Sequence, residues 1–262
     1  MTTSGTKEWA TSNVNFITGC SHDCLYCYAK RMAIRFKRRT EENWKLMMMD
    51  PAKVSKNYRK RKGRIMFPTS HDLTCEYLNF TMKVLQKMLK SKNEVLITTK
   101  PHREVIREIC DSELIQPYKD QIQFRFTITS PYNPDMSIWE PGAPNLDERI
   151  ECLIYAHSKG FKTSISIEPY LADPLNLIKM VEPYTTETIW IGLMNKVMLP
   201  KIGRELYKAE KMDELYSPDF IQTHQQSWLD AGNGKIRFKD SIQNLLKITL
   251  MGETREMSNA KS

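Results

Sequence analysis

The feature that most constrains the fold is a repeated alternation of short apolar runs with longer amphipathic stretches. Helical spacing of apolar residues is seen at 76–90, 101–110, 145–160 and 174–184, and Asn145 and Gly160 are the expected N-cap and stop of the third. Such alternation favours a parallel sheet with right-handed crossovers. We expect an α/β fold, an open partial (β/α)6 TIM-like barrel, in which the loops after the strands gather at one mouth. Its six strands are expected at 13–18, 64–68, 94–99, 122–129, 162–168 and 188–194.

The remaining segments carry weaker patterns. A helix is expected from the first interstrand loop to about Arg38, and another helical stretch over about 204–231, followed by the run 235–239 and a last helix. The span 195–217 is read as irregular, either a lid or a surface loop. The expected domain organisation is an N-terminal extension (1–12), one barrel domain (13–250) and a flexible C-terminal tail (251–262).

Three cysteines lie within eight positions of the loop after the first strand. Cys20, Cys24 and Cys27 in "TGCSHDCLYCYAKRMA" have the spacing C-x3-C-x2-C, and the loop is expected at the barrel mouth. No secretory leader or membrane span is recognisable, so a cytoplasmic location is expected, where thiols stay reduced. This weakens a disulfide interpretation.

Two kinds of metal centre fit three neighbouring thiols. His22 could complete a Cys3His zinc site, although zinc ligands usually come as two separated pairs. Thiolates also hold iron–sulfur clusters, and a [4Fe–4S] cluster needs one ligand per iron. Three protein ligands would leave one iron open to a small chelating molecule.

With an aromatic residue just before the third cysteine, this loop resembles that of the radical S-adenosylmethionine (SAM) superfamily. The segments "ITTKPH", "EPGAPNLDERIECL", "SISIEPYLADP" and "IRFKDSI" are similar to strand ends of small phage and bacterial members and of the spore photoproduct lyase branch, over roughly residues 9 to 245. The resemblance implies a [4Fe–4S] cluster on Cys20, Cys24 and Cys27. It also implies SAM on the open iron, cleaved to a 5′-deoxyadenosyl radical that abstracts hydrogen from a substrate.

The resemblance also implies SAM contacts at the strand ends. Tyr26 would meet adenine, and Ser70 the methionine amino group, with Asp72 as a second possibility for that contact. Most relatives have a glycine-rich acidic stretch there, whereas this chain has "PTSHD". Lys100 would meet the methionine carboxylate.

Two further strand-end residues complete this set. Ser130 would bind ribose or carboxylate, and Glu168 a ribose hydroxyl or the substrate.

Each of these residues also has a purely structural interpretation. Tyr26 could pack the mouth, Asp72 could be an N-cap, Lys100 an exposed turn residue, Ser130 a turn serine and Glu168 half of an ion pair. Glu140 and Arg149, which flank "PGAP", could simply pin a helix.

The other three cysteines are dispersed. Cys110 and Cys152 fall inside helices and are expected to be buried. Cys75 lies near the mouth and is the candidate hydrogen donor to a product radical, although a structural role is favoured.

The formal charge of +8 is concentrated in 30–39 and 53–64, which suits either a polyanion or a solvated surface. With the resemblance, it favours a modified nucleobase in DNA as substrate, for example phage-type isomerisation of an amino-acid-modified thymidine. Repair of a DNA photoproduct and a non-catalytic iron–sulfur nucleic-acid-binding protein are the alternatives. A flavodoxin- or ferredoxin-type electron donor, a monomeric state and, if phage-encoded, the host cytoplasm are further expectations.

Overall fold

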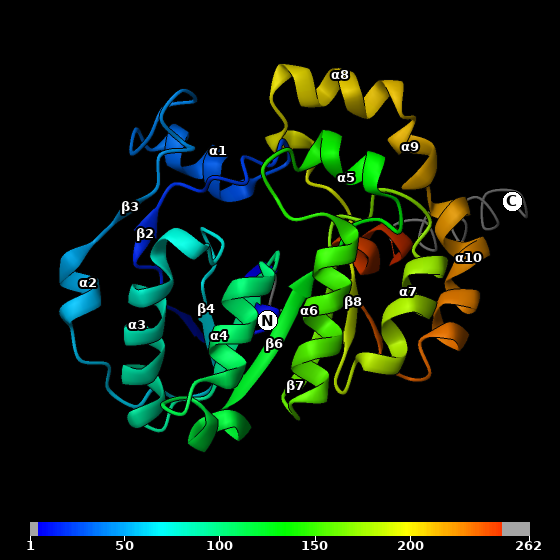
Figure 1. The fold of residues 1–262 in the computed structure, drawn as a ribbon. Coiled ribbons are helices and arrows are strands. Elements are labelled where there is room, and N and C mark those ends of the chain that lie inside the picture. The colour runs from blue at the N-terminus through cyan, green and yellow to red at the C-terminus, as the bar shows by residue number, and fades with distance from the viewer. Residues whose placement is uncertain (1–4, 248–262) are drawn as a thin grey trace, which may run out of the picture.

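The computed structural model describes residues 5–247, and its centre is a curved sheet of seven parallel strands (Figure 1). The α/β partial barrel is confirmed. It has one strand more than expected, because the run 235–239 forms a strand that pairs with the preceding one. The two edge strands are not paired with each other, so the barrel is open. In sheet order the strands are β1 (Ser12–Asn13), β4 (Ile65–Phe67), β5 (Val95–Thr99), β6 (Ile122–Thr127), β7 (Lys162–Ile167), β8 (Ile189–Ile191) and β9 (Ile236–Phe238).

The first expected strand, 13–18, is divided in two. Its start is β1, whereas its end is β2 (Ile17–Thr18), which pairs antiparallel with β3 (Met48–Met49) outside the main sheet. Asn15 lies between them, and its side-chain oxygen accepts from Thr69 N at 2.7 Å and Ser70 N at 3.2 Å. The chain leaves the main sheet at Asn15 because the side-chain amide of this residue binds the end of β4. The cysteine loop follows β2, outside the main sheet.

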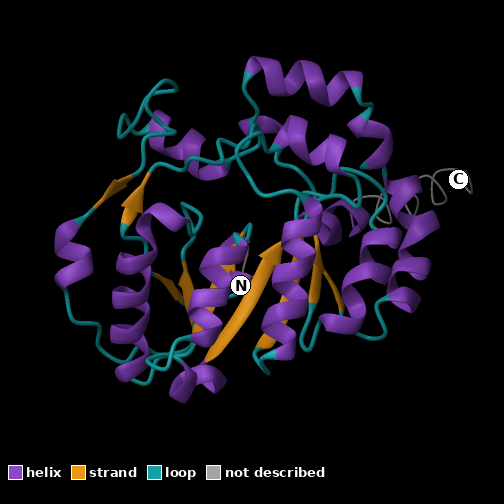
Figure 2. Cartoon of the chain, in the orientation of Figure 1, coloured by secondary structure: helices purple, strands orange, loops and turns teal. Residues whose placement is uncertain are grey.

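Ten α-helices precede the final helical segment 240–247 in the described residues, and they lie outside the sheet or over one end of it (Figures 1 and 2). The apolar core lies between the sheet and the outer helices, as the helical periodicity predicted. Asn145 caps its helix by accepting from Glu148 N at 2.9 Å, and Gly160 has φ +76°, so both predicted ends are confirmed. The helices are α1 (Tyr28–Arg35), α2 (Pro51–Ser55), α3 (Leu78–Lys90), α4 (Arg103–Asp111), α5 (Asn133–Trp139), α6 (Leu146–Ser158), α7 (Leu175–Val181), α8 (Lys201–Ala209), α9 (Met212–Leu215) and α10 (Pro218–Ala231).

Two boundary predictions need correction. The helix after the cysteine loop ends at Arg35, three residues before Arg38. The span 195–217 is not irregular, because it contains a 3-10 turn, α8 and α9. Lys, Glu, Leu and Ala are good helix formers, so a charged segment can be helical on propensity. The last helix is described over 240–247, and the expected tail, 251–262, lies outside the described residues.

The N-terminal residues 5–9 border the barrel interior, where Trp9 is buried and Gly5, Thr6 and Lys7 stay exposed. Trp9 forms a small buried cluster with Met66 and Leu96, and its ring meets that of Trp190 at 5.9 Å. The Nζ atom of Lys239, at the end of β9, donates to Gly5 O at 2.9 Å and pairs with Glu8 at 2.6 Å. This segment therefore closes part of the barrel interior. Within residues 5–247, no helix is long and apolar enough to cross a membrane.

Candidate active site

A cavity of about 820 Å³ lies at the carboxyl ends of the strands. Cys20, Cys24 and Cys27 line one side of it. Of the other predicted site residues, the structure brings five to the same cavity: Tyr26, Ser70, Asp72, Lys100 and Glu168. Segments from distant parts of the chain converge here because parallel strands present all their carboxyl ends at one edge.

The cysteine loop is held in place by backbone contacts. Cys20 N donates to Trp44 O at 3.0 Å, Leu25 N to Trp139 O at 2.9 Å, and Gly142 N to His22 O at 3.0 Å. Gly142 must be glycine, because a Cβ there would overlap the backbone of the loop. Cys27 is the N-cap of α1, and its sulfur accepts from Lys30 N at 3.4 Å. The loop is therefore fixed before any metal binds.

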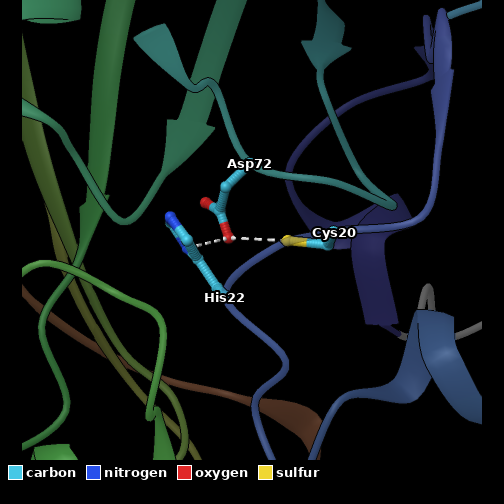
Figure 3. A group of neighbouring side chains, drawn as sticks. All are labelled: Cys20, His22 and Asp72. Atoms are coloured by element: carbon cyan, nitrogen blue, oxygen red, sulfur yellow. Dashed lines mark hydrogen bonds and ion pairs between the residues drawn. The ribbon is translucent and has the colours of Figure 1, made fainter. Parts of the chain in front are cut away.

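The arrangement of the thiols favours a cluster over a single zinc ion. Among residues 5–247, potential metal-ligand atoms of Cys20, His22 and Asp72 lie within 4.8 Å of one another (Figure 3). Cys24 and Cys27 do not belong to this group. A tetrahedral zinc would need its sulfur ligands ~3.8 Å apart. A [4Fe–4S] cluster binds each thiolate to a different iron and accepts wider spacing.

His22 is also poorly suited to a zinc ligand. The ring is fully buried, and its Nδ1 lies 2.9 Å from Asp72 Oδ2 (Figure 3). Its Nε2 lies 2.8 Å from His102 Nε2. Both nitrogens already have partners. Burial raises the pKa of all three loop thiols, that of Cys20 to about 12, so a bound metal would be needed to hold them as thiolates.

Asp72 links the cysteine loop to the end of β5. Its Oδ1 accepts from Lys100 N at 2.7 Å and from Thr99 Oγ1 at 2.8 Å, while Oδ2 meets His22. Burial opposes ionisation, but the charges of His22 and Lys100 outweigh it and hold the pKa of Asp72 well below its usual range. The N-cap interpretation was wrong, because Thr74 occupies the cap position of the following turn.

Lys100 is a buried cation without an anionic partner. It is 9% exposed, and its Nζ lies 5.4 Å from the centre of the Tyr26 ring. Across residues 5–247 this ammonium group makes no hydrogen bond or ion pair. Burial lowers the pKa of Lys100, but electrostatic interactions with Cys24, Glu140 and Asp72 outweigh burial and raise this pKa. The exposed-turn interpretation was wrong, and the site offers a fixed positive charge to a ligand.

Tyr26 is fixed by a buried network that the sequence did not reveal. Its hydroxyl donates to Glu140, which also accepts from Thr129 Oγ1 at 3.0 Å. Arg149 pairs with the other oxygen of Glu140, and both side chains are fully buried. Arg149 also donates to the carbonyls of Thr127 and Pro144. Glu140 and Arg149 therefore position Tyr26, besides holding α6.

Glu168 lines the same cavity from the end of β7. Burial raises the pKa of its carboxyl to about 7, although Lys239 partly opposes this. Lys239 forms its ion pair with Glu8, and within the described chain Glu168 has no ion pair or hydrogen bond of its own. A Cβ at Gly192 would lie 2.9 Å from Glu168, so glycine there makes room for this side chain. The ion-pair interpretation was wrong.

Ser70 lines the cavity between the cysteine loop and Lys100. Its backbone nitrogen donates to Asn15 Oδ1 at 3.2 Å, and within residues 5–247 its hydroxyl makes no hydrogen bond, so the hydroxyl is available to a ligand.

The structure does not bring Ser130 or Cys75 to the cavity wall. Ser130 is fully buried, and its hydroxyl donates to Asp135 at 2.7 Å and accepts from Tyr132 N at 3.0 Å, as a turn serine does. Cys75 is exposed in a 3-10 turn. Partial burial of its thiol and the neighbouring Glu104 raise the pKa of this group. Cys110 and Cys152 are buried, as predicted.

Comparison with known proteins supports the fold. No family model matches the chain. The uncharacterized protein ORF301 of Acidianus two-tailed virus is 28% identical over 173 residues, 62% of this chain and 55% of the viral protein. The chain thus spans about half the length of this relative.

Two kinds of solved structure share the architecture. A variant of spore photoproduct lyase with dinucleoside spore photoproduct has a TM-score of 0.56 and 12% identity, over 87% of this chain and 81% of that one. SuiB of Streptococcus suis bound to S-adenosylmethionine has a TM-score of 0.51 and 12% identity, over 87% and 46%. The chain therefore shares the fold of spore photoproduct lyase and SuiB.

Proposed function

We propose that this chain is a radical SAM enzyme. The observation that carries the proposal is a single cavity, at the carboxyl ends of the strands, in which three closely spaced cysteines and the unpaired ammonium group of Lys100 meet. The thiols suit a [4Fe–4S] cluster with one open iron, and the cation suits the carboxylate of an amino acid bound beside it. SuiB, of similar fold, binds SAM.

The side chains of the cavity have complementary roles in this proposal. Cys20, Cys24 and Cys27 would hold the cluster, which when bound supplies the electron that splits SAM and so provides a 5′-deoxyadenosyl radical for hydrogen abstraction. Lys100 would hold the methionine carboxylate and Ser70 the amino group.

Two more cavity residues would orient the rest of the cofactor. The ring of Tyr26, held by Glu140, would pack against adenine, and Glu168 would accept a hydrogen bond from a ribose hydroxyl or the substrate. A contact from Ser130 would require its hydroxyl to exchange its bond to Asp135.

We further propose that the substrate is a nucleobase in DNA, for example an amino-acid-modified thymidine that is isomerised. The net positive charge, the viral relative and the nucleotide lesion seen with spore photoproduct lyase support a nucleic-acid substrate. Photoproduct repair would need a hydrogen donor near the product radical. Cys75, the candidate donor, is not on the cavity wall, so tailoring is favoured over repair.

A non-catalytic iron–sulfur protein would need the cluster but no site for an amino-acid carboxylate. The unpaired Lys100 in the cluster cavity therefore favours the enzyme. The catalytic proposal also requires a reductant, and we propose an external flavodoxin- or ferredoxin-type protein acting on a monomer.

The test is an anaerobic assay of the reconstituted protein with dithionite and SAM. 5′-Deoxyadenosine is measured alone and with duplex DNA carrying natural or amino-acid-modified thymines. Formation stimulated by one DNA would support both enzyme and substrate class. If 5′-deoxyadenosine forms at the same rate with every DNA, the enzyme proposal stands and the DNA substrate is rejected. If no 5′-deoxyadenosine forms, the enzyme proposal is rejected.

A further inference from the structure

The two basic runs of the chain lie at opposite ends of the barrel. Segment 53–64 leads into the start of β4, and there Arg61 N donates to Asn93 Oδ1 at 2.8 Å, beside the start of β5. Segment 30–39 instead follows the cysteine loop and lies at the mouth, at the same end as α5 and α8 (Figure 1). The positive charge is therefore divided between the two ends, and only segment 30–39 lies at the mouth, directly after the cavity-lining residues Tyr28 and Ala29.

The charges of the run at the mouth differ in whether they are already paired. Lys30 and Arg31 form ion pairs with Glu41, and Lys30 also pairs with Asp23. Within residues 5–247, the exposed side chains of three other cations make no hydrogen bond or ion pair: Arg35, Lys37 and Arg38. These three cations are free to meet an anion.

Exposed aromatic rings accompany these cations. Tyr28, the first residue of α1, lines the cavity and is nevertheless 58% exposed, so it forms part of the lip. Phe36, 59% exposed, follows α1, and the guanidinium of Arg38 lies 5.6 Å from its ring centre. Tyr28 and Arg35 are seven residues apart and so share one face of the helix. A large exposed ring at a cavity lip has no packing function in the free protein.

The helix that carries these residues is firmly supported from behind. Ala33 packs against Trp44 and Cys20 in a small buried cluster, which Cys27 and Ala29 border. Trp44 also binds the cysteine loop through its carbonyl. The position of Tyr28 is therefore tied to the position of the three thiols.

We propose that α1 and the turn after it, Tyr28–Arg38, form the contact face for an unpaired DNA strand. Tyr28 stacks on the base next to the one that enters the cavity, and Arg35, Lys37 and Arg38 meet the phosphates. Aromatic faces interleaved with cations are the features that bind single strands, because every unpaired base offers a π-face and every nucleotide a negative charge. This inference rests on the proposed nucleic-acid substrate.

The experiment measures binding of a fluorescein-labelled 12-nucleotide oligothymidine to the full, cluster-reconstituted chain by anisotropy at several salt concentrations. No SAM or reductant is present. One triple variant carries Arg35→Ala, Lys37→Ala and Arg38→Ala. The matched control triple removes the same charge at the other end of the barrel, by Lys56→Ala, Arg59→Ala and Lys62→Ala.

The variants at the mouth have distinct expected effects. The triple variant of Arg35, Lys37 and Arg38 reduces the magnitude of the slope of log affinity against log salt by about 2. Each of the three phosphate contacts to a single strand contributes roughly 0.7 to this slope. The control triple leaves that slope unchanged. Tyr28→Leu weakens binding about 10-fold, whereas Tyr28→Phe, which keeps the ring, stays within about 2-fold of wild type. Iron content and thermal unfolding of each variant show that it is folded.

Three results would overturn the proposal. The first is an equal loss of oligothymidine affinity in the two triple variants. The second is a Tyr28→Leu protein that binds oligothymidine like wild type. The third is a mouth triple variant that keeps its affinity for oligothymidine and loses affinity only for an acidic flavodoxin. Because binding is measured without SAM, a failure of the proposed contact face can be distinguished from a failure of the proposed radical reaction. A protein that binds the strand but forms no 5′-deoxyadenosine keeps the contact face and loses the proposed activity.

Discussion

Replacing Lys100 with methionine removes a buried, unpaired positive charge from the cavity wall while keeping the length and apolar volume of the side chain. The ammonium group is buried and has no anionic partner in the described chain, so a bound carboxylate would supply its counter-ion. Hydrogen bonds to charged groups contribute about 1.5–3 kcal/mol. Lys100→Met should therefore weaken SAM binding by about 10- to 100-fold.

Anaerobic calorimetry of the reconstituted protein measures this effect. 5′-Methylthioadenosine, which lacks the amino and carboxylate groups, is the matched ligand, and its affinity should not change. Lys90→Met, on the exposed side of α3, is the matched protein control. The reasoning is refuted if Lys100→Met binds SAM within 2-fold of wild type, or if both ligands lose affinity equally.

Other substitutions test the surroundings of the cavity. Gly142→Ala places a Cβ against the backbone of the cysteine loop and should cost about 1–3 kcal/mol in urea unfolding and lower the iron bound on reconstitution; unchanged iron content would contradict the packing argument. Arg149→Met leaves Glu140 buried and unpaired and should destabilise the fold by about 3–5 kcal/mol, and a loss under 1 kcal/mol would show that the pair is dispensable. Burial raises the pKa of Glu168 to about 7, so the folded state binds this proton more tightly than the unfolded chain. The free energy of unfolding should then fall by up to about 3 kcal/mol as pH rises from about 4 to about 7, and Glu168→Gln should abolish that fall in urea titrations at each pH.

The sheet could be predicted from the sequence because its strands are apolar runs bounded by turn residues, which is a local signal. The boundary at 13–18 was missed because the interruption depends on Asn15 binding the end of β4, 54 residues later. Segment 195–217 was predicted to be irregular because its charge suggested a loop. It is mostly helical because its residues have high helix propensity and Tyr207 is buried.

The site was predictable only where residue type and spacing carry the chemistry. The three cysteines were found in this way, whereas the strand-end residues Ser70, Lys100 and Glu168 were implied by the family resemblance, and the cavity contains them all. Contacts between distant segments gave no local signal. Tyr26 with Glu140 spans 114 residues and His22 with His102 spans 80, so neither network could be read from one sequence.

The most direct test of the account is iron analysis and electron paramagnetic resonance of the dithionite-reduced, reconstituted chain, with and without SAM. The account predicts about four irons per chain on Cys20, Cys24 and Cys27, and a reduced-cluster spectrum that shifts when SAM occupies the open iron. Cys24→Ala should lose this spectrum, whereas Cys75→Ala, outside the cavity, should keep it. One zinc per chain, or a cluster spectrum that SAM leaves unchanged, would contradict the account.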